Sequence, residues 1–152
     1  MIEAIFIAEK DDAEQSSMPM VELERGKGIR GDRYFGRSQA PGQSISFIEQ
    51  EEIENYNRKH GQAISLSATR RNVITRGIRL NDLVGREFSV GGVRFLGVEL
   101  CEPCETLGSR LENDSIRKKD VVKAFLHRAG IRAEILNDGH IEVGMSFDLA
   151  ST

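Results

Sequence analysis

The sequence lacks the marks of a membrane or secreted protein. Its 152 residues contain no apolar stretch approaching the roughly 20 residues that a membrane-spanning helix needs. The N-terminus has no basic region, and its apolar stretch covers only residues 4–8, so we expect no signal peptide. The chain has only two cysteines, Cys101 and Cys104, too few for a secreted disulfide scaffold. We therefore expect a cytoplasmic protein without a membrane partner.

The chain also lacks a strong excess of one charge. Its 21 basic and 24 acidic residues give a net charge of −3, which argues against a surface built to bind nucleic acid. Hydrophobic residues make up 39% and charged residues 30%, as in ordinary globular proteins. The length suits one domain, and we find no internal repeat or interdomain linker. Residues 1–152 are expected to form a single domain.

Short strand signals dominate the chain. Residues 2–9 are mostly apolar, and Val21 and Leu23 alternate with glutamates, so both segments predict strands. Glu87–Val90 and Val93–Leu100 flank a Gly-Gly pair and predict a hairpin. Asn137-Asp138-Gly139 predicts a second hairpin between residues 131–136 and 140–143, and a last strand is expected at residues 145–149.

Two helices are clear in the pattern. Ser46 and Glu49 fit a capping box, which predicts a helix that starts near Ser46 and ends at Gly61, with Ile53 and Tyr56 on its inward face. Apolar residues at helical spacing predict a second helix over residues 120–129, with a glycine stop at Gly130. Many short strands and two helices predict a mainly β fold, a barrel or sandwich with peripheral helices.

Two basic segments stand out from this acidic chain. Residues 25–37 hold five basic residues and one acidic residue, a local balance of 5 − 1 = +4, and include Arg33. A second segment places Arg70, Arg71, Arg76 and Arg79 around Asn72. Arginine forks and glycine-rich backbone suit a phosphate-bearing ligand, whereas the alternative is that these arginines are solvated or paired with glutamates. The segment at residues 26–31 also matches GxGxxG, but no helix signal follows it, which disfavours a dinucleotide site.

The two cysteines form a Cys-Glu-Pro-Cys motif at residues 101–104, after a strand and before a predicted helical turn at Glu105. A thiol at a helix start near arginines has a lowered pKa. A zinc site is disfavoured, because there is no second CxxC and His60, His127 and His140 are scattered. A thioredoxin-type dithiol, an inert reduced pair and a single catalytic or metal-binding cysteine remain open. We assign no role to the histidines.

Five stretches in this order resemble the MOSC family, named for the C-terminal domain of molybdenum cofactor sulfurases. They are GDRY at 31–34, SISFIE at 44–49, RNVITRGI at 71–78, LNDLVG at 80–85 and EPC at 102–104 followed by Leu107. The resemblance runs over about residues 2–149. It implies a closed β-barrel of complex topology and a site for the molybdenum cofactor.

The resemblance also implies roles for particular residues. Cys104 would be the catalytic cysteine, as a molybdenum ligand or as a persulfide sulfur carrier. Arg33, Arg71 and Asn72 would hold the phosphate or pterin. Cys101 departs from the minimal family pattern and is a candidate resolving thiol for Cys104.

The function we expect is therefore that of a cofactor-binding MOSC protein, either in reduction of N-hydroxylated compounds or in cofactor sulfuration. The chain has neither a desulfurase nor an iron–sulfur domain, so enzymatic turnover would need a cysteine desulfurase or an electron-transfer protein as partner. The alternatives are a non-catalytic module that binds and delivers the cofactor, and a CxxC dithiol redox protein.

Overall fold

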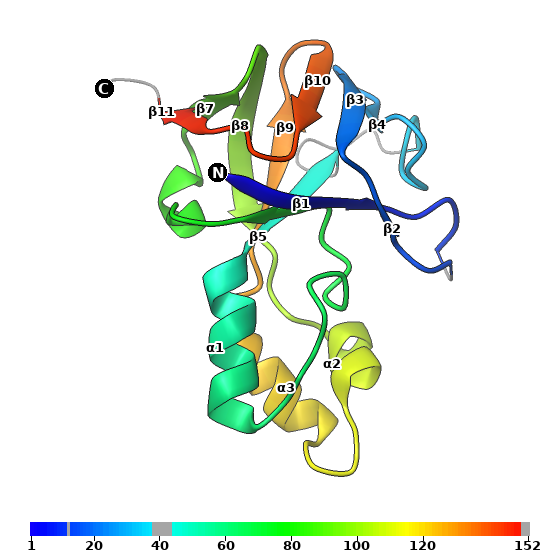
Figure 1. Ribbon diagram of the computed structural model, residues 1–152, viewed down its shortest axis with the longest axis vertical. Helices are drawn as coiled ribbons and strands as arrows, with labels where there is room; N and C mark the ends of the chain where they lie inside the picture. The colour runs from blue at the N-terminus through cyan, green and yellow to red at the C-terminus, as the bar shows by residue number, and fades with distance from the viewer. Residues whose placement is uncertain (12, 38–43, 150–152) are drawn as a thin grey trace.

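The computed structural model describes residues 1–11, 13–37 and 44–149 of the chain. These residues form one large curled sheet, one small sheet and a lobe of helices on one side of the large sheet (Figure 1). The strands of the described residues are β1 (Ile2–Ile7), β2 (Ser16–Ser17), β3 (Met20–Glu24), β4 (Gly28–Ile29), β5 (Ile45–Glu49), β6 (Val73–Thr75), β7 (Glu87–Val90), β8 (Val93–Leu100), β9 (Ile131–Ile135), β10 (Gly139–Glu142) and β11 (Phe147–Leu149). The helices are α1 (Gln50–His60), α2 (Glu105–Leu111) and α3 (Lys118–Phe125), with a short 3₁₀ helix at Leu80–Leu83. None of these helices has the length and apolarity needed to cross a membrane.

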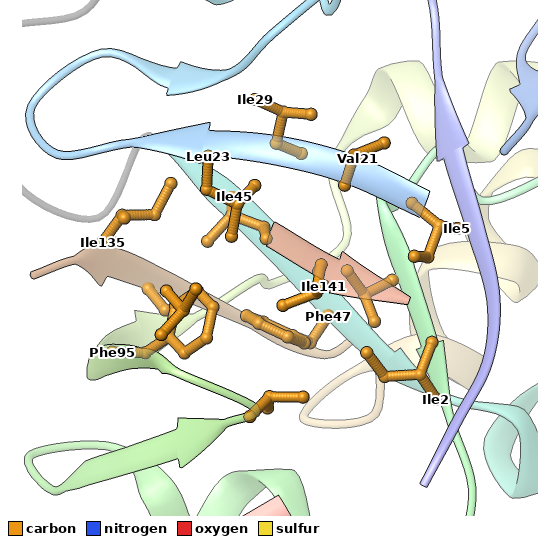
Figure 2. Close-up of a cluster of buried hydrophobic side chains, with 14 of the residues drawn as sticks. Ile2, Ile5, Val21, Leu23, Ile29, Ile45, Phe47, Phe95, Ile135 and Ile141 are labelled. Atoms are coloured by element: carbon orange, nitrogen blue, oxygen red, sulfur yellow. The ribbon is translucent and has the colours of Figure 1, made fainter. Parts of the chain in front are cut away.

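The mainly β fold is confirmed, but the expected closed barrel is wrong. The large sheet has the order β11-β7-β8-β9-β5-β6-β1-β2 and curls into a half-barrel, with β11 and β2 as its two edges among the described strands. The small sheet has the order β10-β3-β4. Val21, Leu23 and Ile141 of the small sheet pack into the same core as Phe47 and Phe95 of the large sheet (Figure 2). The interior is thus closed by packing between two sheets rather than by a continuous ladder.

The two predicted hairpins have different outcomes. β7 and β8 form the expected hairpin around Gly91 and Gly92. The second hairpin is wrong, because β9 pairs with β8 and β5 whereas β10 pairs with β3. The turn side chains bind elsewhere: Asn137 donates to the Gly92 carbonyl oxygen (2.9 Å), and Asp138 accepts the Arg25 N–H (2.8 Å). These contacts lie at the turn where the chain leaves β9 of the large sheet and enters β10, which pairs with β3 in the small sheet.

The first helix starts later than the capping box predicts. Residues 45–49 are strand β5, and Phe47 and Ile48, which point to opposite faces, are both fully buried. The Ser46 hydroxyl is bound to Asn72 rather than to a helix end. The end of the helix at Gly61 is confirmed, because Gly61 has φ +61° and its N–H donates to the Asn57 carbonyl oxygen. Two-sided burial against both the sheet core and the helical lobe therefore overrides the local capping signal.

Helices α2 and α3 pack with α1 on one side of the large sheet. α3 is shifted toward the N-terminus relative to the predicted residues 120–129, and α2 begins at Glu105 as expected. Ile53, Tyr56, Leu107 and Phe125 share a second buried cluster, which joins the helices to the underside of β5 and β6. Between residues 25 and 37 the structure contains turns and strand β4 but no helix, so the GxGxxG match lies outside a dinucleotide-binding context.

Candidate functional site

A pocket of about 370 Å³ lies where the large sheet meets the segment before β6 and helix α2. Five of its lining residues are arginines, and only Asp11 contributes a carboxylate. The lining residues are Asp11, Arg33, Tyr34, Ile45, Ser46, Arg70, Arg71, Asn72, Cys101, Arg110 and Arg132. Arg33 and Arg132 have carboxylate partners, whereas Arg70, Arg71 and Arg110 form no salt bridge with the described residues. These three guanidinium groups are suited to an anionic ligand.

The fold brings the two basic sequence segments together. Arg33 comes from the turn after β4, and Arg70 and Arg71 come from the segment before β6. The remaining arginines of these segments lie outside the pocket lining: for example, Arg30 pairs with Glu22 and Glu24, and Arg76 pairs with Glu3 and Glu54. Pairing with glutamates is thus confirmed for Arg30 and Arg76, whereas phosphate binding stays a prediction for the arginines that line the pocket.

Arg71 is fixed by backbone oxygens rather than by a carboxylate. Its Nε donates to the Ala129 carbonyl oxygen (2.9 Å) and its Nη1 to that of Thr69 (3.3 Å). No salt bridge to Arg71 forms within the described part of the chain. Burial lowers the pKa of Arg71, and nearby Arg132 lowers it further. The charge of Arg71 is held in position with hydrogen-bonding capacity left over for a ligand.

Arg33 and Arg70 also line the pocket. The side chain of Arg33 is only 7% exposed; it lies 3.4 Å from Asp32 and stacks 4.5 Å from the centre of the Tyr34 ring. Arg70 has the left-handed φ of +60°, and its guanidinium donates to the backbone oxygens of Asp11 (3.0 Å) and Ala13 (2.8 Å). A left-handed arginine is strained, and such residues are concentrated at functional sites.

Asn72 lies in the pocket lining with its side chain already engaged. Its Oδ1 accepts the backbone N–H and the hydroxyl of Ser46 (3.1 and 3.2 Å), and its Nδ2 donates to the Phe6 carbonyl oxygen (3.2 Å). Asn72 therefore ties together β5, β1 and the start of β6. This gives it a structural role in shaping the pocket wall.

The two cysteines have opposite environments. Cys101 is 1% exposed and lines the pocket, and burial raises the pKa of its thiol against the opposing effect of Arg71. Cys104 is exposed at the N-terminal end of α2, outside the lining residues, and both thiols are free. The backbone N–H of Leu107 lowers the pKa of the Cys104 thiol, with smaller contributions from Thr106 and Arg71. Cys104 is the thiol that more readily forms a thiolate.

The cysteine loop is anchored by a residue for which we predicted no role from the sequence. Glu102, between the two cysteines, accepts the backbone N–H of His127 (2.9 Å) and faces its Nδ1 at 2.8 Å. The Cys101 N–H donates to the Gly130 carbonyl oxygen (2.8 Å). The loop is thus attached at two points to the turn between α3 and β9.

Two pocket arginines were missed by the sequence reasoning. Arg132 lies on β9 and pairs with Glu99 (3.4 Å), and Arg110 is exposed on α2. Each stands in a segment whose charges are otherwise mixed, so no local excess indicates either of them. Only the pairing of β9 with β5 and the placement of α2 bring them to the pocket.

Comparisons with known proteins agree on the fold. The YuaD protein from Bacillus subtilis superimposes with a TM-score of 0.85 over 99% of this chain and 95% of its own, at 21% identity. YiiM from Geobacillus stearothermophilus has a TM-score of 0.76 over 99% of this chain and 76% of its own, at 15% identity. YiiM from Escherichia coli has a TM-score of 0.72 over 99% of this chain and 70% of its own, also at 15% identity. The comparison with curated protein sequences gave no match.

The family is shown by the sequence rather than by these distant structures. The model of the MOSC domain matches residues 35–148, which include Arg71, Asn72 and both cysteines. This range contains most of the pocket and all of the helical lobe. The chain therefore belongs to the MOSC domain family, which is associated with the molybdenum cofactor.

Proposed function

We propose that this MOSC protein binds the molybdenum cofactor in the arginine pocket and uses Cys104 as a ligand of the metal or as a carrier of sulfur. The observation that carries the proposal is the convergence of five arginines and a single carboxylate in one pocket close to a thiol of lowered pKa. The phosphate of the cofactor is the group that such a lining would bind.

The residues fit a phosphate-bearing ligand. Arg70 lines the pocket, and its buried Nε has no hydrogen-bond partner among the described residues. Leaving such a group unpaired costs about 1–3 kcal/mol, which an acceptor on a bound ligand would recover. The volume of about 370 Å³ also lies within the range of small-molecule sites. Arg33 and Arg71 would hold the phosphate, and Asn72 would keep the wall in place.

The Cys104 environment supports both roles proposed for its sulfur. When bound, the cofactor supplies a redox-active metal that accepts soft ligands such as thiolate. Within the described residues, no group of three or more His, Cys, Asp and Glu side chains is arranged to hold a metal. A metal held by Cys104 would therefore take its other ligands from the pterin and from solvent.

In the sulfur-carrier role, the Cys104 thiolate attacks the terminal sulfur of a donor persulfide. The donor S–S bond breaks, the donor leaves as a thiolate, and Cys104 becomes the persulfide. The Cys101 thiolate then attacks the inner sulfur, so that hydrosulfide leaves and a Cys101–Cys104 disulfide forms. A cysteine desulfurase is the class of partner that supplies such a persulfide, whereas the reductive role requires an electron-transfer protein.

A dithiol redox protein is the second candidate. The contrast between an exposed Cys104 of lowered pKa and a buried Cys101 of raised pKa is the asymmetry that an attacking and a resolving thiol require. A Cys101–Cys104 disulfide potential that is the same with and without molybdenum would favour this function. The third candidate function is that of a delivery module, which would bind the cofactor but, unlike an enzyme, would not turn over a substrate.

Matched serine variants test the proposal. Protein would be produced in a host that makes the cofactor, and its molybdenum would be measured by elemental analysis and its persulfide by intact mass. We expect Cys104→Ser to lose the metal or the persulfide and Cys101→Ser to keep it. Wild-type molybdenum and persulfide in Cys104→Ser would refute the role of Cys104. Reduction of an N-hydroxylated compound with a supplied electron donor then separates an enzyme from a delivery module.

A further inference from the structure

A second cavity, distinct from the arginine pocket, is lined mainly by residues of α1 and α3 and of the segments on either side of α3. The helices α1 and α3 lie side by side in the helical lobe (Figure 1). The volume of the cavity is about 530 Å³. From α1 it is lined by one stripe of residues at helical spacing, which includes Glu52, Tyr56 and Lys59. From α3 it is lined by Asp120 and Lys123. The residues of the proposed cofactor site take no part in this groove.

Two side-chain contacts accompany the groove. Arg128 lies 3.8 Å from the Glu52 carboxylate. Gln62 donates to the Ser115 hydroxyl (3.0 Å). The nine residues from Glu52 to His60 span about 12 Å of helix. A groove of this length and of about 530 Å³ suits a small molecule.

The floor of the groove combines apolar surface with an unsatisfied hydroxyl. The Tyr56 ring packs on Phe125 at 4.6 Å between centres, and Ile116 and Ala124 line the groove beside it. Tyr56 is only 4% exposed, and its buried Oη has no hydrogen-bond partner among the described residues. Burial also raises the pKa of Tyr56, so the group remains a neutral hydrogen-bond donor. A buried donor of this kind calls for an acceptor.

The walls supply positive charge. Lys59 and Lys123 form no salt bridge with the described residues, whereas the Glu52 carboxylate is already paired with Arg128. Asp120 is the opposing charge; it lies in the first turn of α3, where the helix dipole favours it, just as the dipoles favour Lys59 and Lys123 in the last turns of α1 and α3. The lining therefore holds three cationic side chains, Lys59, Lys123 and Arg128, against two carboxylates, a formal balance of 3 − 2 = +1, beside a hydroxyl that lacks an acceptor among the described residues.

From this arrangement we infer that the groove between α1 and α3 is a second ligand site, for a small molecule that joins a flat apolar ring to a carboxylate or phosphate. The ring would lie over Ile116 and Ala124, the Tyr56 hydroxyl would donate to an oxygen of the anionic group, and Lys59 and Lys123 would neutralise it. This inference does not depend on cofactor binding.

Titration of the ligand-free protein with benzoate, phenyl phosphate and the neutral benzamide tests the inference. Amide NMR shifts would be followed at Lys59 and Lys123 and, as a separate readout for the arginine pocket, at Arg71. We expect benzoate or phenyl phosphate to shift the two lysine amides, and the stronger of them identifies the preferred anion. Benzamide should bind at least about 10-fold more weakly, because it lacks the charge.

Two variants make the result specific. Tyr56→Phe removes only the unpaired hydroxyl, so it should leave the thermal midpoint unchanged or raised while weakening the anion about 10-fold. The double substitution Lys59→Gln and Lys123→Gln should weaken anion binding further. The control Lys27→Gln, in the turn between β3 and β4, should leave the anion affinity unchanged. Shifts confined to the arginine pocket, equal binding of benzamide and benzoate, or wild-type affinity in Tyr56→Phe would each overturn the inference.

Discussion

Arg71→Met is the substitution that separates binding from folding in the arginine pocket. Methionine keeps the length and the apolar part of the arginine stem but removes the charge and all five donors. We expect a large loss of anion affinity with a small change in the free energy of unfolding. Arg94→Met, which removes an exposed arginine paired with Glu87 outside the pocket, is the matched control.

The magnitudes follow from the contacts of Arg71. Two carbonyl oxygens, those of Ala129 and Thr69, lose their donors, which costs up to about 2 kcal/mol at about 1 kcal/mol each. Against this, the variant removes a buried cation that has no carboxylate partner among the described residues and that Arg132 repels. We therefore expect stability within about 2 kcal/mol of wild type. A lost charged contact to phosphate is worth about 1.5–3 kcal/mol, so affinity should fall about 10- to 100-fold.

Urea unfolding would measure the stability, and calorimetric titration with inorganic phosphate at low salt would measure the affinity, since screening weakens such contacts. The reasoning would be refuted if Arg71→Met bound phosphate as tightly as wild type. It would also be refuted if the variant lost more than about 4 kcal/mol of stability, because Arg71 would then be a structural residue. Arg94→Met should change neither quantity by a comparable amount.

Three further predictions concern the cysteines and the frame around them. Backbone N–H groups of α2 lower the pKa of Cys104, so the rate of its alkylation by iodoacetamide should begin to rise at a lower pH in the folded protein than in the unfolded chain. Cys101 is buried and its pKa is raised, so it should react more slowly than Cys104; equal alkylation rates of the two thiols would contradict this. Gly130→Ala should cost about 4 kcal/mol or more in urea unfolding, because its φ is +92° and a Cβ would lie 1.9 Å from the Phe47 carbonyl oxygen; near-wild-type stability would contradict the packing. Asn72→Ala should cost about 2–3 kcal/mol through its three side-chain hydrogen bonds, with an unchanged midpoint as the contrary result.

Local patterns in the sequence predicted the parts of the fold that local physics determines. The β7–β8 hairpin and the end of α1 at Gly61 depend on glycines and neighbouring residues, and both are confirmed. The capping box at Ser46 failed because burial of β5 on both faces outweighs a helix signal of a few residues. The destination of β10 could not be read from Asn137-Asp138-Gly139, because it depends on contacts of that turn with β3 and the β7–β8 hairpin.

Some residues of the pocket could also be predicted from local sequence patterns, and others could not. Charge clustering and the resemblance indicated Arg33 and Arg71, and both line one pocket. Arg110 and Arg132 carry no comparable signal, because their approach depends on tertiary structure. Exposure also separates Cys104 from Cys101 in a way that their spacing does not reveal. The sequence thus indicated three of the five pocket arginines, Arg33, Arg70 and Arg71, whereas the fold determines which other groups lie beside them.

The central claim is that the arginine pocket holds a phosphate-bearing pterin. Its most direct test is the pterin content of protein purified from a host that makes the cofactor, measured by fluorescence after oxidation. We expect near-equimolar pterin in wild type and in Arg94→Met, and strong depletion in Arg71→Met. No pterin in wild type, or equal pterin in wild type and Arg71→Met, would contradict the claim.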